Sequence, residues 1–465
     1  MRCIFTYGIL YDTVCNIINK LNNLLWGFGT IALVFGAGIF LTVRFKGFNI
    51  IHIGHIFKSA FFEKKEDTDK KHEGGISRFQ ALSTALAASM GTGNIIGVAA
   101  AVSMGGPGAV FWMWVCALFG TATGLAENIL GTKYQSGGSL GSGPMSYIAD
   151  GTGMPRLAVL YAAACAAASF GIGNMTQTNA FSAAMSEFDI PAWISGIAAA
   201  AVCGAVIFGG GKKVAAAAEK MVPAVSLFYI AGAVTVIVLF GKNIPDVLKT
   251  IFGSAIGYSQ IAGGVCGAAL KRAVTVGLRR GVFSNEAGMG SSVLVHTETG
   301  CKEPLKMGMW AVAEIVIDTL ICCTATALVI LLTGADASGA EGLAMVTVGF
   351  SRGLGNIAPF FVSASTAVFA VCTLLGWYFY GEKCVRCIFK SNTSKAVFVY
   401  RILYTAAAFL GAVTELSLVW GTADLLNWFM LVINLSAVLL LNGEAAECVN
   451  DYTQSMFGRK KTGHL

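Results

Sequence analysis

The chain has 465 residues, of which 55% are hydrophobic and only 12% are charged. Roughly a quarter of the residues in an ordinary soluble domain are charged, so this composition excludes a water-soluble fold of such a size. The formal net charge is +7, but the basic residues are spread over many separate loops, which argues against a nucleic-acid-binding patch.

Uncharged apolar runs recur along the whole chain, for example at 26–43 and 157–185. About 20 apolar residues suffice to cross roughly 30 Å of hydrocarbon as a helix. The runs are continuous, whereas strands of a membrane barrel would alternate apolar and polar positions. We therefore predict an all-α membrane protein with eleven transmembrane helices, at 24–43, 79–103, 109–131, 157–185, 190–209, 221–241, 268–298 (broken), 307–332, 357–380, 396–416 and 418–441.

The loops between these spans differ in their content of lysine and arginine. Loops rich in positive charge stay in the cytoplasm. We therefore expect a multi-pass protein of the plasma (inner) membrane, with the N-terminus outside and the C-terminus in the cytoplasm. The basic residues gather in alternate loops, at 44–78, 132–156, 210–220, 299–306, 381–395 and 442–465.

The segment 63–75, EKKEDTDKKHEGG, is the only highly charged stretch and is predicted to be a cytoplasmic loop. It separates an accessory first helix from ten further spans. The predicted organisation is an outer segment, accessory helix and charged loop at 1–78, a five-helix repeat at 79–241, a second inverted repeat at 242–441, and a cytoplasmic tail at 442–465.

Two of the predicted spans are interrupted by glycine and polar residues. SMGTGN places Gly91 to Asn94 inside one span, and RRGVFSNEAGMGSS (279–292) interrupts another span five spans later. Since five is odd, the second set of spans is inverted relative to the first. Inverted repeats with broken leading helices indicate the binding site of a secondary transporter. Close helix packing is an alternative interpretation of the glycines, but it leaves Asn94 unexplained. A nucleotide-binding loop would need glycine where Ile96 stands.

The breaks offer chemistry for a zwitterion and a cation. Backbone N–H groups at a helix start attract an anion, and carbonyl oxygens suit a hard cation. Carbonyls around Gly281–Ser284 and the side chains of Asn285 and Gln177 are candidate acceptors for an ammonium group, although Gln177 could equally be interhelical glue. Thr373 could offer a cation ligand, and Trp377 could either wall the pocket or anchor a span end.

Several ionisable residues fall inside the predicted spans, where each costs several kcal/mol unless it is paired. Glu286 lies within the second interruption, and Glu314 and Asp318 are four residues apart on one helix face. Arg279 and Arg280 could pair with one of these acids. We regard the three acids as functional candidates without an assigned role.

A membrane-embedded hydrolase is an alternative from another class. Such an enzyme needs a nucleophile with a positioned base. The sequence has five histidines, and none is expected deep in a span; His296 is expected at the cytoplasmic rim. Glu127 is expected near the inner end of a span, with its carboxylate either solvated or snorkelling to the membrane surface. The single C-x-x-C pair, Cys384 and Cys387, is weak evidence for a metal.

Several segments together resemble the alanine or glycine:cation symporter family (AGCS), which includes the sodium:alanine symporters. The resemblance covers the chain from about Trp26 to Asn442. Its implied fold is a LeuT-type 5+5 inverted repeat with broken first and sixth core helices and one N-terminal accessory helix. The segments are GTGNIIGVAAAVSMGGPGAVFWMW, GPMSYI, FGIGNMTQTN, RRGVFSNEAGMGSS, DTLICCTATA and LLGWYFYGE.

The resemblance also implies a set of site residues. Sodium contacts are implied for Asn94 and Thr373. Two positions depart from the usual pattern: Cys372 stands where a hydroxyl is more common, and Ser146 replaces a tyrosine. A thiol is a poor sodium ligand, which puts a second sodium ion in question. The implied substrate contacts are Gly91, Thr92, Gly93, Gln177, Phe283, Ser284, Asn285 and Trp377.

The function implied is sodium-coupled symport of small neutral amino acids, chiefly alanine and glycine, into the cell by alternating access. Na⁺ is then a co-transported ion, and the partners are the amino acid, Na⁺ and the lipid bilayer, with no nucleic acid and no obligatory protein partner. The alternatives are a membrane-embedded enzyme, a proton-coupled amino-acid carrier and a passive channel. A channel would need a polar stripe along several spans, whereas polarity here clusters at one depth.

Overall fold

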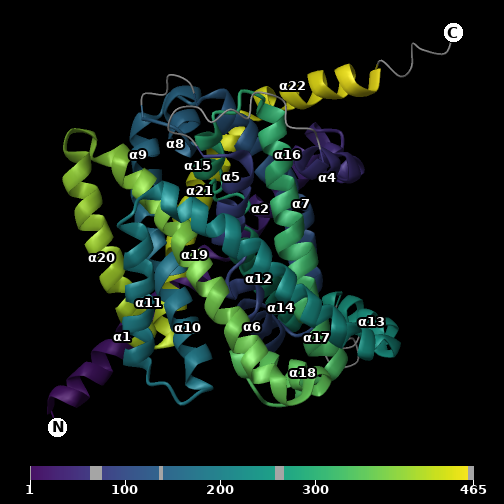
Figure 1. Ribbon diagram of the computed structural model, residues 1–465. Helices are drawn as coiled ribbons and strands as arrows, with labels where there is room; N and C mark the ends of the chain where they lie inside the picture. The colour runs from purple at the N-terminus through teal and green to yellow at the C-terminus, as the bar shows by residue number, and fades with distance from the viewer. Residues whose placement is uncertain (1, 63–75, 136–139, 257–265, 459–465) are drawn as a thin grey trace.

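The computed structural model describes residues 2–62, 76–135, 140–256 and 266–458, so the predicted loop at 63–75 lies outside the described residues. Within these ranges the chain is helical and contains no strand. Three short segments depart from α-helix where the argument needs them: η2 (Thr92–Asn94), η4 (Gly171–Met175) and η8 (Val316–Cys323). The α-helices in Figure 1 are α1 (Arg2–Leu25), α2 (Phe28–Arg44), α3 (Phe48–Ile51), α4 (Ile53–Phe62), α5 (Arg78–Ser89), α6 (Ile96–Gly105), α7 (Gly108–Lys133), α8 (Pro144–Ser146), α9 (Pro155–Phe170), α10 (Thr176–Ser186), α11 (Ala192–Ile207), α12 (Gly211–Leu239), α13 (Ile244–Ala255), α14 (Cys266–Asn285), α15 (Val293–His296), α16 (Pro304–Ile315), α17 (Thr324–Thr333), α18 (Gly342–Leu354), α19 (Ala358–Ile388), α20 (Thr393–Val413), α21 (Leu416–Leu440) and α22 (Asn442–Thr453).

Seven of the predicted spans coincide with helical runs that are long and apolar enough to cross a membrane. The others are shorter or interrupted: α1 and α2 form a pair bent by 45°, and α6 and α11 are short apolar helices. The prediction of a polytopic helical membrane protein is confirmed, and the eleven-helix arrangement stays a prediction. The seven runs are Gly108–Lys133, Pro155–Ser186, Gly211–Leu239, Pro304–Thr333, Gly342–Ile388, Lys390–Val413 and Leu418–Leu440.

The two interrupted segments lie against each other in an antiparallel sense. Helix α5 packs on α15, and α6 packs on α14, so the breaks between α5 and α6 and between α14 and α15 are neighbours. Helix α7 supports this arrangement because it packs closely on both α14 and α16. At Gly277 an added Cβ would lie 2.6 Å from the carbonyl oxygen of Ala109, so only glycine lets these two helices approach so closely.

The long helix α19 crosses the face of the molecule seen in Figure 1 and reaches both of its ends. Helix α1 lies at the lower end, and α8, α15 and α22 lie at the upper end. The predicted tail at 442–465 is helical over its described part, in α22 and the turn that follows it. Lys133, at the end of α7, holds α22 through an ion pair of 2.7 Å with Glu444.

Candidate functional site

The first break is a short and fully buried turn. Helix α5 ends at Ser89, Gly91 is extended (φ −124°, ψ −152°), and Thr92–Asn94 form a single 3₁₀ turn before α6 begins. The side chain of Asn94 closes this turn, because its Oδ1 accepts a hydrogen bond of 3.0 Å from the backbone N–H of Gly91. Buried peptide groups therefore find partners even where the helix is interrupted. The interruption predicted at 91–94 is confirmed.

Gln177 bridges the first break to α10. Its Oε1 accepts hydrogen bonds from the hydroxyl of Thr92 at 2.9 Å and from the backbone N–H of Thr92 at 3.3 Å. Its Nε2 donates to the carbonyl of Ile172 at 2.8 Å, inside the wider π-helical turn η4. These contacts fix the orientation of the amide. Asn174, by contrast, donates to the carbonyl of Tyr404 and so links two helical segments by a hydrogen bond.

Thr373 of α19 lies directly against Gly91. A Cβ added to Gly91 would lie 2.3 Å from the hydroxyl oxygen of Thr373 and 3.1 Å from Oε1 of Gln177. This wall leaves no room for a side chain at position 91. The hydroxyl of Thr373 is buried and has no hydrogen-bond partner within the described part of the chain. An unpaired hydroxyl beside an interrupted helix is free to bind an ion or a polar ligand.

The second break starts later than the sequence predicts. The interruption was predicted at 279–292, but helix α14 continues through Gly281–Ser284 to Asn285, so the first part of that prediction is wrong. Gly281 serves helix packing instead, because an added Cβ would lie 3.0 Å from the Cβ of Cys116 on α7. The interruption begins at Glu286, whose φ of +56° places a non-glycine residue in the left-handed region, and it ends where α15 starts.

Asp318 joins the two breaks. Asn94 donates to its Oδ1 at 2.7 Å, and Ser284 donates to its Oδ2 at 2.6 Å. Thr319 also donates to Oδ2, at 2.8 Å, and the carbonyl of Asn94 accepts from Thr326 at 2.7 Å. The sequence indicated Asp318 as a buried acid but gave no role. In the structure it gathers a carboxylate, two hydroxyl groups and an amide at one point.

Phe283 packs against the first break and stacks on a second aromatic ring. Its ring lies 3.3 Å from the position of an added Cβ on Gly93, and it stacks on Trp420 with ring centroids 4.6 Å apart. The guanidinium of Arg280 lies 4.5 Å from the centre of the Trp420 ring and 3.5 Å from the carboxylate of Asp424. Asp424 also pairs with Arg279 at 3.2 Å. The expectation that these arginines pair with Glu286, Glu314 or Asp318 is therefore wrong.

Trp377 is fully buried and contacts the second break. Its indole N–H donates to Oε1 of Glu286 at 2.8 Å, and Ser291 donates to the other oxygen of the same carboxylate. An added Cβ on Gly173 would lie 2.0 Å from the Cβ of Trp377, so the indole fills the space beside η4. This burial is incompatible with the alternative of an anchor at the membrane interface. Asn285 accepts from the backbone N–H of Ala287, and its Nδ2 has no partner within the described chain.

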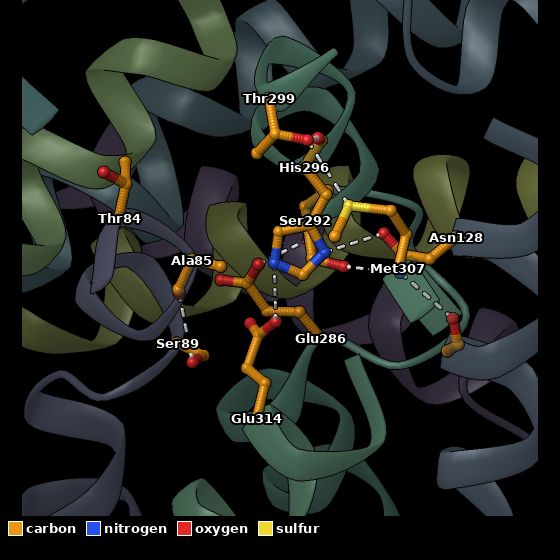
Figure 2. Close-up of polar contacts among 12 residues, drawn as sticks. Thr84, Ala85, Ser89, Asn128, Glu286, Ser292, His296, Thr299, Met307 and Glu314 are labelled. Atoms are coloured by element: carbon orange, nitrogen blue, oxygen red, sulfur yellow. Dashed lines mark hydrogen bonds and ion pairs between the residues drawn. The ribbon is translucent and has the colours of Figure 1, made fainter. Parts of the chain in front are cut away.

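Two further expectations are corrected. His296 is only 1% exposed and lies between Asn128 and Glu314 rather than at an open rim (Figure 2). Glu127 is also 1% exposed and accepts a hydrogen bond of 2.5 Å from Asn434 instead of pointing into solvent. Asn128 is far from His296 in the sequence, and Asn434 is far from Glu127, so no local pattern could have indicated these contacts.

A cavity of about 520 Å³ opens at the end of the molecule that holds α8 and α15. Basic side chains from α12 and α19 line it, and Lys383 forms an ion pair with Glu298 there. None of the predicted site residues lines this cavity. The lining includes Ser142, Met145, Lys212, Glu298, Phe379, Glu382, Lys383 and Arg386.

Known proteins are similar to this chain over almost its full length. Residues 11–464 match the model of the sodium:alanine symporter family. The sodium/alanine symporter AgcS of Methanococcus maripaludis is 40% identical over 92% of this chain and 95% of its own length. An uncharacterized transporter of Haemophilus influenzae is 36% identical over 96% of this chain and 97% of its own length.

A third relative, the probable sodium/glutamine symporter GlnT of Bacillus subtilis, is 36% identical over 96% of this chain and 92% of its own length. These relatives are transporters, and the chain is accordingly a membrane transporter and not an enzyme. The interrupted helices with their buried polar junction accord with that class. The chain belongs to the sodium:alanine symporter family.

Proposed function

We propose that this transporter carries small neutral amino acids, chiefly alanine and glycine, into the cell together with Na⁺ by alternating access. The observation that carries the proposal is the junction at Asp318, where Asn94 of the first break and Ser284 beside the second meet one buried carboxylate. In the proposed organisation the two breaks belong to inverted five-helix repeats at 79–241 and 242–441, in an inner membrane with the N-terminus outside.

The substrate's place is the first break. Gly91 and Gly93 have no side chain to occupy this place, and Thr92, Gln177 and Thr373 surround it with oxygen atoms. A zwitterion has an anionic end, which suits the N-terminus of α6, and an ammonium end, which needs oxygen acceptors. Close walls from Phe283 and Thr373 favour a side chain no larger than methyl. Ser284, Asn285 and Trp377 complete the proposed substrate contacts.

The proposed sodium site is the oxygen-rich junction around Asp318. Hard cations prefer carboxylate, hydroxyl and carbonyl oxygens, and Asp318 supplies the negative charge that compensates for desolvation. Asn94, whose amide also holds Asp318, and Thr373, whose hydroxyl has no hydrogen-bond partner among the described residues, are the further proposed ligands. The neighbouring Cys372 is buried and offers only a soft sulfur atom, so the proposal needs no second sodium ion.

One sodium ion is energetically sufficient. A charge moving down 100 mV releases about 2.3 kcal/mol, and a tenfold concentration gradient adds about 1.4 kcal/mol. The sum of about 3.7 kcal/mol sustains an amino-acid gradient of roughly several hundredfold.

The test is uptake of radiolabelled alanine by proteoliposomes that contain the purified full-length protein, with gradients of Na⁺, Li⁺ or K⁺ at clamped voltage. The proposal predicts saturable uptake, above equilibrium, with Na⁺ outside. Accumulation driven by a pH gradient without sodium would identify a proton-coupled carrier instead. Flux without accumulation would indicate a channel.

A further inference from the structure

The side chains of His296 and Glu314 face each other through one polar atom each. The Nε2 atom of His296 lies 3.8 Å from Oε2 of Glu314, and the two side chains are 1% and 3% exposed. Neither atom has any hydrogen-bond partner within the described residues. Figure 2 shows the imidazole and the carboxylate directed at one another between α15 and α16. Buried polar atoms left unpaired are costly, so this arrangement calls for an explanation.

The other side of the imidazole determines its tautomer. Asn128 donates through Nδ2 to the carbonyl of Gly124 at 3.0 Å and to the hydroxyl of Ser292 at 3.2 Å. Its Oδ1 must therefore face His296, and it lies 2.9 Å from Nδ1. An oxygen acceptor at this distance requires a proton on Nδ1. In neutral His296, Nε2 then carries a lone pair that points at Glu314.

A lone pair facing an ionised carboxylate is repulsive, and one proton between the two atoms removes the conflict. We propose that His296 and Glu314 form a proton-binding site of this transporter, which holds one proton between Nε2 and Oε2 in the conformation described here. The proton is on Glu314, whose hydroxyl is donated to Nε2 of the neutral imidazole.

Among the described residues, the charged groups that act most strongly on Glu314 include no cation. The acidic groups near Glu314 are Glu286 of the second break, Asp318 on its own helix and Glu127 on α7. Tyr380 is the titratable group that α19 places near it, and α5 contributes the uncharged Ser89. Coulomb repulsion opposes ionisation of all these buried carboxylates together, so an exchangeable proton is expected within the group.

The position of the pair couples it to transport, and this step depends on the proposed function. His296 ends the short helix α15 that follows the second break, and Glu314 precedes the junction at Asp318 on the next long helix. Any movement of α15 away from α16 separates Nε2 from Oε2. The proton is then released, so raising the pH should disfavour the conformation in which His296 and Glu314 face each other.

The transport experiment uses wild-type protein in proteoliposomes at fixed sodium gradient and clamped voltage. The pH is varied equally on both sides, and a trapped pH indicator reports proton movement. We expect alanine uptake to change by up to about tenfold per pH unit across the titration of the pair, as linkage to one proton requires. Sodium-driven uptake with a flat pH profile and no proton movement would overturn this inference and leave the proposed function intact.

Glu314→Gln tests the assignment to this residue. The amide can donate to Nε2 and so mimics the protonated pair, and we expect the pH dependence and the proton movement to be lost. Asp246→Asn is the control, since it removes an exposed acid of α13 instead; it should keep the wild-type profile. A wild-type profile in Glu314→Gln would contradict the proposal. If Glu314→Gln does not fold, His296→Gln serves in its place.

Infrared spectroscopy of the purified protein tests the site without transport. The wild type should show a carbonyl stretching band from a protonated carboxyl group that shrinks as the pH rises. Glu314→Gln should lack part of this band, whereas a spectrum unchanged by the substitution would refute the proton site. This result stands even if sodium-driven alanine uptake is absent, which would refute the proposed function alone.

Discussion

The amide of Asn94 donates a hydrogen bond of 2.7 Å to the carboxylate of Asp318, a residue 224 positions later in the chain. The same nitrogen lies 3.1 Å from the backbone carbonyl of Asp318. The other end of the amide caps Gly91, so one side chain ties the first break to the helix that follows the second. A substitution of either residue should therefore alter the hydrogen bonding of both breaks.

Asn94→Ala should weaken the sodium dependence of uptake more than the choice among amino acids. The substitution leaves the N–H of Gly91 and one oxygen of Asp318 without partners, at a cost of about 1–3 kcal/mol for each buried group. We expect the sodium concentration for half-maximal uptake to rise by about tenfold or more. An unchanged sodium titration would remove Asn94 from the ion site.

Asp318→Asn should act on sodium more strongly still, because it removes the negative charge of the junction. Hydrogen bonds to charged groups contribute about 1.5–3 kcal/mol, and three side chains donate to this carboxylate. Sodium titration of alanine uptake should show at least a tenfold loss of apparent affinity. Asp246→Asn, on an exposed side chain of α13, is the matched control and should leave the titration unaltered. Equal titrations for both variants would refute the role of Asp318.

Gly91→Ala should abolish alanine uptake, since the new Cβ would lie 2.3 Å from the hydroxyl of Thr373. Gly36→Ala provides the control on α2, because an added Cβ meets nothing within 4 Å there. Both variants should be folded, which size-exclusion chromatography and thermal unfolding can check. Normal uptake by Gly91→Ala would show that the wall formed by Thr373 is not part of the site.

Trp377→Phe and Trp377→Ala separate two roles of this indole. Phenylalanine keeps much of the volume but loses the hydrogen bond of 2.8 Å to Glu286. Alanine empties the space as well and should admit larger side chains such as that of leucine. Competition of unlabelled amino acids with labelled alanine measures the ranking of substrates. If Trp377→Ala keeps the original ranking, Trp377 is not a wall of the pocket.

Hydropathy and interruptions in the sequence predicted the long spans and the position of the first break. These features are local. The length of an apolar run by itself indicates a membrane span, and the low helix propensity of GTGN by itself indicates an interruption. The start of the second break was harder to predict. Gly281 does not mark a break; it lies inside a helix, where the absence of a side chain allows close packing against Cys116. Glycine alone does not distinguish these two uses.

The partners of buried polar groups could not be predicted. Glu127 contacts Asn434 across 307 residues of sequence, and His296 contacts Asn128 across 168. Such pairs depend on how the helices pack, which a single sequence does not specify. The same reason explains why Arg279 and Arg280 proved to pair with Asp424, far along the chain, and not with the nearer acids.

The most direct test of a shared site for amino acid and ion is equilibrium binding of tritiated alanine to the purified full-length protein at increasing sodium concentration. The account predicts saturable binding whose affinity rises with sodium, and, by reciprocity, sodium binding that tightens by the same factor when alanine is present. Binding of alanine that is indifferent to sodium, or no binding at any sodium concentration, would contradict it.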